Sequence, residues 1–537
     1  MSGPRPELVF TGTVASAGLA SGRILLHARE AIGARPAGDP EEELEMLKAA
    51  LWGAAERLGE LRAAGGDAAQ EILEFQIALT EDDALIDPVR EAIAEGMSAD
   101  EAWRRELNEQ IADYEAAEDA YFRARSADLA DLRDRVLEIL AGRTGTEEDI
   151  PADGAIYVGE DLPPSRFLEI DWKRCRGAAL VKGSANSHVA ILARALGVPL
   201  VIGLELGRRD IVSGAEAILD AEEGRLIQDP QAPTRDSFTR RLAGRRAEAE
   251  AETAFLPKPA VTRGGERIAV AINVDEPRVV ESVDPAHCDG IGLTRTEFLF
   301  AGPADNRSEE AQLTIYARLI DWARGRPVTV RTLDAGGDKP IAGLTPEGES
   351  NPFLGLRGIR LSLTRPDVFR PQLRALARVA VRGPLKVMLP MVTVLREVEE
   401  TRAIVQEILA ELGRAGIPAA PPRLGMMVEV PAAALNVAAF DVDFYSIGSN
   451  DLVQYVTATG RDCAAVAALH DPLDPAVLEL IGRVARHGAA SGREVSLCGD
   501  MASDPRYLPA LLDLGLRSLS VAPARLAKVK AEIARHG

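Results

Sequence analysis

The stretch GSANSHVAILARALGVPLVIG, residues 183–203, contains a single histidine, His188, between small polar residues and an apolar run. Ser187 can cap a helix that begins at this histidine. The residues expected to face inward from that helix are Ala190, Ile191, Ala193 and Leu196. A histidine in the first turn lies near free N–H groups and the positive end of the helix dipole, so it can accept a phosphoryl group as a nucleophile. A structural histidine has the same spacing, and the spacing leaves both interpretations open.

Two carboxylates follow apolar runs later in the chain, Glu429 in MVEVP and Asp451 in GSNDL. If these runs are neighbouring parallel strands, both carboxylates lie at one edge and can share a Mg²⁺ ion, with room for water and phosphate oxygens. The alternative is that each is an ordinary strand-end carboxylate paired with an arginine.

Basic side chains and one thiol occupy similar positions. The basic residues are Arg295, Arg331, Lys339, Arg357 and Arg461. The planar guanidinium group binds carboxylate and phosphate through two parallel hydrogen bonds, so such a cluster beside a metal suits a small phosphorylated acid. Cys498 in SLCGD can donate a proton to a carbanion or enolate, although most isolated cysteines are small buried hydrophobic residues.

These residues follow eight apolar runs that recur from about residue 260. The runs are RIAVAINV, CDGIGLT, VTVRTLD, KVMLPMV, LGMMVEV, DFYSIGS, EVSLCGD and RSLSVAP. Most precede a helix-like segment, and this alternation predicts a closed (β/α)₈ barrel whose chemistry lies at the carboxyl ends of the strands. An open doubly wound sheet fits the number and spacing of the units less well.

The first part of the chain has another pattern. Short β-like runs occur in ELVFTGTVASAGLASGRILLH and return within residues 150–228. Between them, two apolar stripes at helical spacing comprise Leu44, Leu47, Leu51, Ala54, Leu58 and Leu61, and Trp103, Leu107, Ile111 and Tyr114. Ser98 and Glu101 have the spacing of a capping box before the second stripe. We expect a small α/β domain with inserted antiparallel helices, followed by a charged helix over residues 233–256.

Composition limits the function classes. The 537 residues have a formal net charge of −21, which argues against binding to nucleic acid or to anionic membranes. The four cysteines show no CxxC spacing, which argues against a disulfide framework or a structural zinc site. The N-terminus lacks a signal pattern, and no long window is uninterruptedly apolar. We expect a cytoplasmic protein without membrane insertion.

Together these segments resemble the Enzyme I family of the bacterial phosphoenolpyruvate:sugar phosphotransferase system. The matching segments are GTVASAGLASGRILL, LEFQIALTEDDALIDPV, NSHVAILARALGVPLVIG, GIGLTRTEFLF, RTLDAGGDKP, NPFLGLRGIRL, MMVEVPAAA, DFYSIGSNDLVQY and SLCGD. The resemblance spans nearly the whole chain. It implies a transferase that takes the phosphoryl group of phosphoenolpyruvate onto a histidine and releases pyruvate. The group then passes to the phosphocarrier protein HPr, which begins sugar transport and phosphorylation.

The resemblance also implies a role for each residue. His188 would be phosphorylated, and Cys498 would protonate the enolate at its methylene carbon. Glu429 and Asp451 would bind Mg²⁺. The residues expected to bind phosphoenolpyruvate are Arg295, Arg331, Lys339, Arg357, Asn450 and Arg461.

The implied organisation has four parts. A swivelling phosphohistidine α/β domain comprises residues 1–37 and 143–230, and a helical HPr-binding domain, 38–142, is inserted in it. A linker helix, 231–258, leads to a (β/α)₈ barrel, 259–537, that binds phosphoenolpyruvate and forms a homodimer. Acidic residues that would suit a basic face of HPr, or would simply be solvated, are Glu71, Glu74, Glu81, Asp82 and Asp83.

Several positions depart from the family pattern. They are Gln76 (often histidine), Pro163 (often threonine), Ser184 and Asn186 (in a motif that usually reads GGxTSH), Gly460 (usually aspartate) and Asp500 (usually glutamate). None removes a catalytic residue, so we expect activity. The alternatives are a divergent paralogue in a regulatory branch and a catalytically silent docking protein. Related dikinases need a nucleotide-binding domain and a Gly-rich phosphate loop that we do not find.

Overall fold

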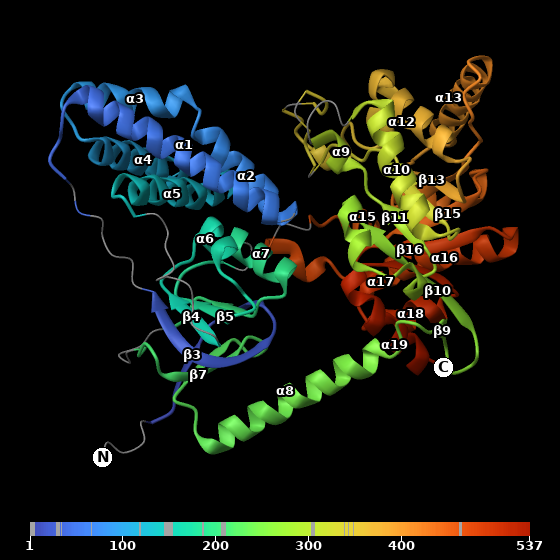
Figure 1. Ribbon diagram of the computed structural model, residues 1–537. Helices are drawn as coiled ribbons and strands as arrows, with labels where there is room; N and C mark the ends of the chain where they lie inside the picture. Colours follow the sequence, from blue (N-terminus) through green and yellow to red (C-terminus); the bar gives the residue numbers. More distant parts are fainter. Residues whose placement is uncertain are drawn as a thin grey trace. The chain divides into compact units, whose positions relative to one another are not determined.

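The structure is a computed structural model (Figure 1). It describes residues 6–27, 33, 35–65, 67–116, 120–143, 154–184, 187–205, 211–301, 307–337, 339–341, 343–346, 348–460 and 464–537. The chain divides into two compact units, Met1–Gly244 and Arg245–Gly537. Each unit is described by itself.

The first unit contains a group of helices that lie alongside one another, coloured blue to teal in Figure 1. They are α1 (Pro40–Gly65), α2 (Asp67–Leu79), α3 (Asp83–Ala94), α4 (Ala99–Ala116) and α5 (Ala120–Leu140). Leu47, Leu58, Trp103 and Leu107 are at most 1% exposed, so both predicted apolar stripes form the core of this group. Burial of large apolar side chains along one stripe is what holds such helices together.

The predicted capping box at the start of α4 is wrong. The hydroxyl of Ser98 is buried and has no hydrogen-bond partner among the described residues. Instead, Oε2 of Glu43, on α1, accepts from the backbone N–H of Ala99 at 2.9 Å. Arg35 binds the same carboxylate, and this contact lowers the pKa of Glu43 to about 2, so it stays ionised. A tertiary contact therefore replaces the local cap.

The first unit also contains a mixed sheet. Its strands are β1 (Leu8–Thr11), β2 (Thr13–Ser16), β3 (Leu19–His27), β4 (Ala155–Gly159), β5 (Cys175–Leu180), β6 (Leu200–Ile202), β7 (Glu216–Asp220) and β8 (Arg225–Gln228), in the order β1-β8-β7-β3-β4-β5-β6-β2. Strands β3 and β4 pair in parallel, although α1 to α5 lie between them in the sequence. The helices are therefore an insertion between neighbouring strands. Two short helices, α6 (Pro164–Glu169) and α7 (His188–Leu196), connect later strands.

Helix α8 (Ala232–Thr253) follows the sheet and is rich in charged residues. Phe238 is its one buried residue in the part of the chain that the structure describes. The boundary between the two units falls within this helix.

The second unit is a closed parallel barrel. Its strands are β10 (Arg267–Val274), β11 (Ile291–Thr294), β12 (Val328–Arg331), β13 (Leu385–Leu389), β14 (Arg423–Val428), β15 (Phe444–Gly448), β16 (Glu494–Cys498) and β17 (Ser518–Val521). They pair in sequence order, and β10 contacts both β11 and β17, which closes the barrel. A short strand, β9 (Ala260–Val261), pairs antiparallel with β10. All eight apolar runs are confirmed as strands.

Helices follow most of the barrel strands. They are α9 (Glu297–Ala301), α10 (Glu309–Ala323), α11 (Ile359–Thr364), α12 (Pro366–Val379), α13 (Leu395–Arg414), α14 (Pro431–Leu435), α15 (Ser449–Thr457), α16 (Pro475–Ser491), α17 (Asp500–Ser503), α18 (Leu508–Asp513) and α19 (Leu526–Arg535). The large core of the unit lies between this layer and the strands, with Val387 and Leu389 as examples. Met388, between them, belongs to a separate cluster with Cys498 and Phe444. Alternate strand residues point to opposite faces, so this cluster lies inside the barrel. None of the described helices is long and apolar enough to cross a membrane.

Candidate functional site

His188 is the first residue of α7, as predicted, and Ser187 caps the helix by accepting from the N–H of Ala190 at 3.3 Å. The predicted buried face is wrong in part, because Ile191 and Leu196 are 40% and 51% exposed. The buried residues of the helix are Val189, Ala190, Leu192 and Ala193. The contact face is thus turned toward Val189 and Leu192, which pack with the strands and helices around them.

The imidazole of His188 lies against α5. Its Nδ1 is 3.1 Å from Oδ1 of Asp128, whose side chain is fully buried. Arg125 donates to the other oxygen, Oδ2, at 3.2 Å, and Gln76 donates to the backbone oxygen of Asp128 at 3.2 Å. Sequence reasoning missed Asp128, because sixty residues separate it from His188 and no local spacing connects them.

A second buried carboxylate lies one turn further along α5. Asp131 accepts from Gln76 at 3.0 Å and from the hydroxyl of Ser165 at 2.7 Å. Arg135 donates to the same hydroxyl at 2.7 Å. Burial raises the pKa of Asp131. These bonds join α5 to α2 and α6. Gln76, which stands where the family often has histidine, is therefore a buried residue and does not lie on the surface of the helices.

In the barrel, Asp334 connects most of the basic residues that we predicted to act together. Its carboxylate lies 3.0 Å from Nη1 of Arg331 and 3.1 Å from Nζ of Lys339. Arg357 donates to both of its oxygens at 3.1 Å. Burial raises the pKa of Asp334, but the three cations outweigh it and hold the pKa far below its usual value. The three cations are therefore held around one ionised carboxylate.

Glu297 completes this network on the side of α9. Its Oε1 accepts from Nη2 of Arg331 at 2.7 Å and from the N–H of Asp334 at 3.1 Å. Burial raises the pKa of Glu297, but Arg331 and Lys339 lower it more. The sequence places Glu297 and Asp334 at strand ends but does not indicate that they position Arg331.

The two predicted metal ligands follow neighbouring parallel strands: Glu429 comes directly after β14, and Asp451 lies in the first turn of α15, which follows β15. Asp451 accepts two hydrogen bonds from Arg357, each of 3.1 Å. Glu429 accepts at Oε1 from the N–H of Met391 at 2.6 Å. Burial, with Asp451 and Asp334 nearby, raises the pKa of Glu429 to about 8. A bound cation would relieve this repulsion, so the pair fits a metal ion.

The donor set also limits which ion would fit. No group of three or more His, Cys, Asp or Glu side chains with metal-binding geometry occurs among the described residues. Two carboxylates suit Mg²⁺, which usually retains waters and shares substrate phosphate oxygens rather than binding in an all-protein cage.

Cys498 ends β16, next to Gly448 at the end of β15. Its Sγ donates to the backbone oxygen of Ile447 at 3.5 Å, and burial raises the pKa of the thiol to about 11. The thiol is therefore protonated at neutral pH and can act as an acid. Asn450 lies nearby and donates to Asp500 at 3.2 Å. Asp500, which stands where the family usually has glutamate, therefore still accepts a hydrogen bond from Asn450.

Arg295 forms an ion pair with Asp275 at 2.9 Å rather than with Asp334 or Glu297. The Nε atoms of Arg295 and Arg331 are buried and have no hydrogen-bond partner among the described residues. Such unpaired donors at strand ends fit an anionic substrate. Arg461 and Asn186 lie outside the described residues, as does the side chain of Glu71.

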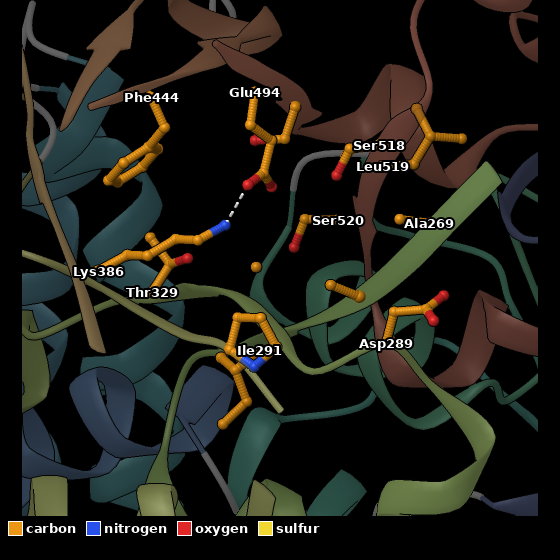
Figure 2. Close-up of a pocket in the computed structure, with 14 residues that line it drawn as sticks. Ala269, Asp289, Ile291, Thr329, Lys386, Phe444, Glu494, Ser518, Leu519 and Ser520 are labelled. Atoms are coloured by element: carbon orange, nitrogen blue, oxygen red, sulfur yellow. Dashed lines mark hydrogen bonds and ion pairs between the residues drawn. The ribbon is translucent and has the colours of Figure 1, made fainter. Parts of the chain in front are cut away.

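A cavity of about 110 Å³ occurs elsewhere in the barrel (Figure 2). Its lining includes Lys386, Glu494 and Ser518, which lie at or next to the first residues of β13, β16 and β17. The cavity therefore lies at the amino ends of the strands, opposite to the candidate residues. Lys386 and Glu494 form an ion pair there, as Figure 2 shows.

Comparison with known families divides the chain into an N-terminal region, a mobile domain and a barrel domain. The chain matches the N-terminal region of PEP-utilising enzymes over residues 11–125, their mobile domain over 150–224 and their PEP-binding domain over 249–537. The chain therefore belongs to the PEP-utilising enzymes.

Similar proteins define the family more narrowly. The phosphoenolpyruvate-protein phosphotransferase of Priestia megaterium is 35% identical, with 92% of this chain and 87% of that protein aligned. The enzyme of the same name from Geobacillus stearothermophilus is 34% identical, with 98% and 93% aligned. The multiphosphoryl transfer protein of Rhodobacter capsulatus is 37% identical, with 92% and 58% aligned. The chain is a member of the phosphoenolpyruvate-protein phosphotransferase family, and it is a phosphotransferase that uses phosphoenolpyruvate in the phosphotransferase system.

Proposed function

We propose that His188 takes the phosphoryl group from phosphoenolpyruvate and passes it to a histidine of the phosphocarrier protein HPr. The observation that supports this most directly is the position of His188 at the start of α7, with one ring nitrogen bonded to Asp128. On a ring held in this way, Nε2 is the nitrogen left to carry the phosphoryl group while His188 lies against the helices. The helix N-terminus adds N–H groups and a positive dipole end, which favour a phosphoryl group.

The first half of the reaction uses the carboxyl end of the barrel. Arg331, Lys339 and Arg357 bind the substrate phosphate and carboxylate together with Arg295, Asn450 and Arg461. Nε2 of His188 attacks phosphorus, and the P–O bond breaks with its electron pair going to the enolate oxygen. Cys498 then donates its proton to the methylene carbon, which gives pyruvate. The raised pKa of its thiol supports this role as an acid.

Glu429 and Asp451 hold the Mg²⁺ ion in this proposal. When bound, the ion neutralises negative charge on the phosphate oxygens. The hydrogen bond from the N–H of Met391 to Glu429 orients its carboxylate, which supports this role. Arg357 orients Asp451 in the same way, through two hydrogen bonds.

The remaining features of the proposal rest on the family resemblance. The α/β domain, 1–37 and 143–230, swivels between the helical HPr-binding domain, 38–142, and the barrel, 259–537, with 231–258 as the linker. The barrel forms a homodimer, and the enzyme works in the cytoplasm. A swivelling carrier explains how one histidine meets two partners in turn.

The test is label transfer from phosphoenolpyruvate labelled on phosphate. Purified protein with Mg²⁺ should acquire an acid-labile, alkali-stable label, and His188→Ala should acquire none. His536→Ala, which removes another of the six histidines, is the matched control and should be labelled like the wild type. A labelled His188→Ala variant would contradict the assignment. An unlabelled but folded wild type would favour the docking protein instead.

A further inference from the structure

Asp128 connects the inserted helices to the α/β part of the first unit by contacting the imidazole ring of His188. It lies on α5, whereas His188 begins α7, which follows β5. Its Oδ1 is 3.1 Å from Nδ1 of His188. The side chain of Asp128 is fully buried, and that of His188 is 21% exposed, so the contact is shielded on the carboxylate side.

The other partners of Asp128 determine where its carboxylate points. Arg125, one turn earlier on α5, donates to Oδ2 at 3.2 Å, and its guanidinium lies over the ring of Phe75 at 4.4 Å. Gln76 holds the backbone oxygen of Asp128. With Oδ2 bound to Arg125, Oδ1 faces the imidazole.

We propose that Asp128 is a positioning residue for the second half of the reaction, in which the phosphoryl group leaves His188 for the acceptor histidine. This inference rests on the proposed role of His188. An ionised carboxylate only accepts hydrogen bonds, so Nδ1 must bear the proton and Nε2 must bear the phosphorus. Asp128 therefore selects one tautomer of the ring and its orientation.

The chemistry of transfer explains why the proton on Nδ1 matters. The acceptor nitrogen forms a new N–P bond while the bond from Nε2 to phosphorus breaks, and its electron pair returns to Nε2. Because Nδ1 keeps its proton beside Asp128, the leaving group is a neutral imidazole. Without that proton the leaving group would be an imidazolate, which is a far stronger base and leaves more slowly.

The same reasoning separates the two halves of the reaction. The proposed swivelling of the α/β domain moves His188 away from α5 when it meets phosphoenolpyruvate. Asp128 belongs to the insert and stays behind, so it acts when His188 is docked on the helices. Loss of Asp128 should therefore slow transfer to HPr and leave uptake from phosphoenolpyruvate unchanged.

The test uses the full chain with Asp128→Asn. We expect label uptake from phosphoenolpyruvate within about twofold of the wild type, and transfer from the isolated labelled protein to HPr slower by about a hundredfold, at the lower end of proton-handling effects. The matched control is Asp131→Asn, because Asp131 is another buried carboxylate on the same helix and accepts from Gln76 and Ser165 rather than facing His188. It should leave both halves of the reaction near wild type.

A second measurement reports the tautomer directly. The ¹⁵N shifts of the His188 ring should show a protonated Nδ1 in the wild type and a mixture of tautomers in Asp128→Asn. Equal slowing of both halves, or the same defect in Asp131→Asn, would show a structural role and overturn the inference. Label uptake with unchanged transfer in Asp128→Asn would contradict the inference alone. No label in the wild type would contradict the proposed function and this inference together.

Discussion

The two ends of the barrel hold charge in different ways. At the carboxyl ends of the strands, Asp334 binds Arg331, Lys339 and Arg357 in a network where Asp334 and Arg357 are fully buried. At the amino ends, Lys386 pairs with Glu494, whose side chain remains 40% exposed. Removing charged groups from water costs free energy that their mutual attraction largely offsets but rarely exceeds. The buried network at the carboxyl ends is therefore not explained by its contribution to stability.

The difference supports the proposed site at the carboxyl end. The carboxyl end retains buried Nε donors on Arg295 and Arg331 that have no partner among the described residues, and a carboxylate, Glu429, whose pKa is raised by its surroundings. The amino end has the cavity of Figure 2, yet its ion pair is complete without any ligand. The cavity by itself would therefore indicate the end of the barrel opposite to the candidate residues.

The largest effect should come from breaking the buried network. In Arg357→Met, the carboxylates of Asp334 and Asp451 lose two hydrogen bonds each. We expect the free energy of unfolding to fall by about 3–5 kcal/mol, as for other buried ion pairs that lose one partner. Urea denaturation of the variant and the wild type measures this loss. A loss below about 1 kcal/mol would mean that the network is solvated in solution.

The second effect is a dependence on pH and Mg²⁺ at the carboxyl end. The folded-state pKa of Glu429 is raised from its ordinary value of 4.5 to about 8, so the folded state binds its proton more tightly than the unfolded state. Its contribution to stability is full below pH 4.5 and is lost as pH rises through 8. Without metal, stability from this group should therefore decline over that window.

Thermal unfolding in Mg²⁺ and in chelator should measure this decline. If Glu429 holds Mg²⁺ as proposed, the ion binds the ionised carboxylate, so the stabilisation it gives should grow with pH and be greatest above pH 8. Glu429→Gln removes the titrating group and should show no such growth. The same growth in Glu429→Gln would assign the effect to another site.

The smallest effect should come from the amino end. In Lys386→Met, an apolar chain of similar length replaces a lysine that lies over the ring of Phe444 at 5.4 Å, and Glu494 is left partly solvated. We expect the free energy of unfolding to change by about 1 kcal/mol or less, with label uptake unchanged. Loss of uptake in a stable variant would give the amino end a part in the reaction and end the contrast between the two ends.

Local patterns predicted much of the fold because each expresses one physical rule. The eight apolar runs became the barrel strands because short apolar segments between helices are buried on both faces. Leu47 and Leu58 became core because they repeat at the helical period. The start of α7 was predicted because Ser187 accepts a bond from a residue only three positions away.

The patterns failed where a distant residue competes with a local one. Ser98 has the spacing of a cap, but Glu43 reaches the same helix end from α1. Ile191 has the spacing of a buried residue, but the strands and helices around α7 contact Val189 and Leu192 instead. In each case the local sequence permits both outcomes, and the packing of other elements selects one.

The candidate site divides in the same manner. The sequence by itself determined which residues end the barrel strands and that His188 begins a helix, because spacing along one strand or helix decides both. Only the tertiary structure decided that Asp334 holds three cations together and that Asp128 faces His188. Those contacts join segments 60 residues apart for His188 and Asp128, and up to 23 apart for Asp334 and Arg357. Side chains so separated in sequence meet only when sheet and helix packing bring their elements together.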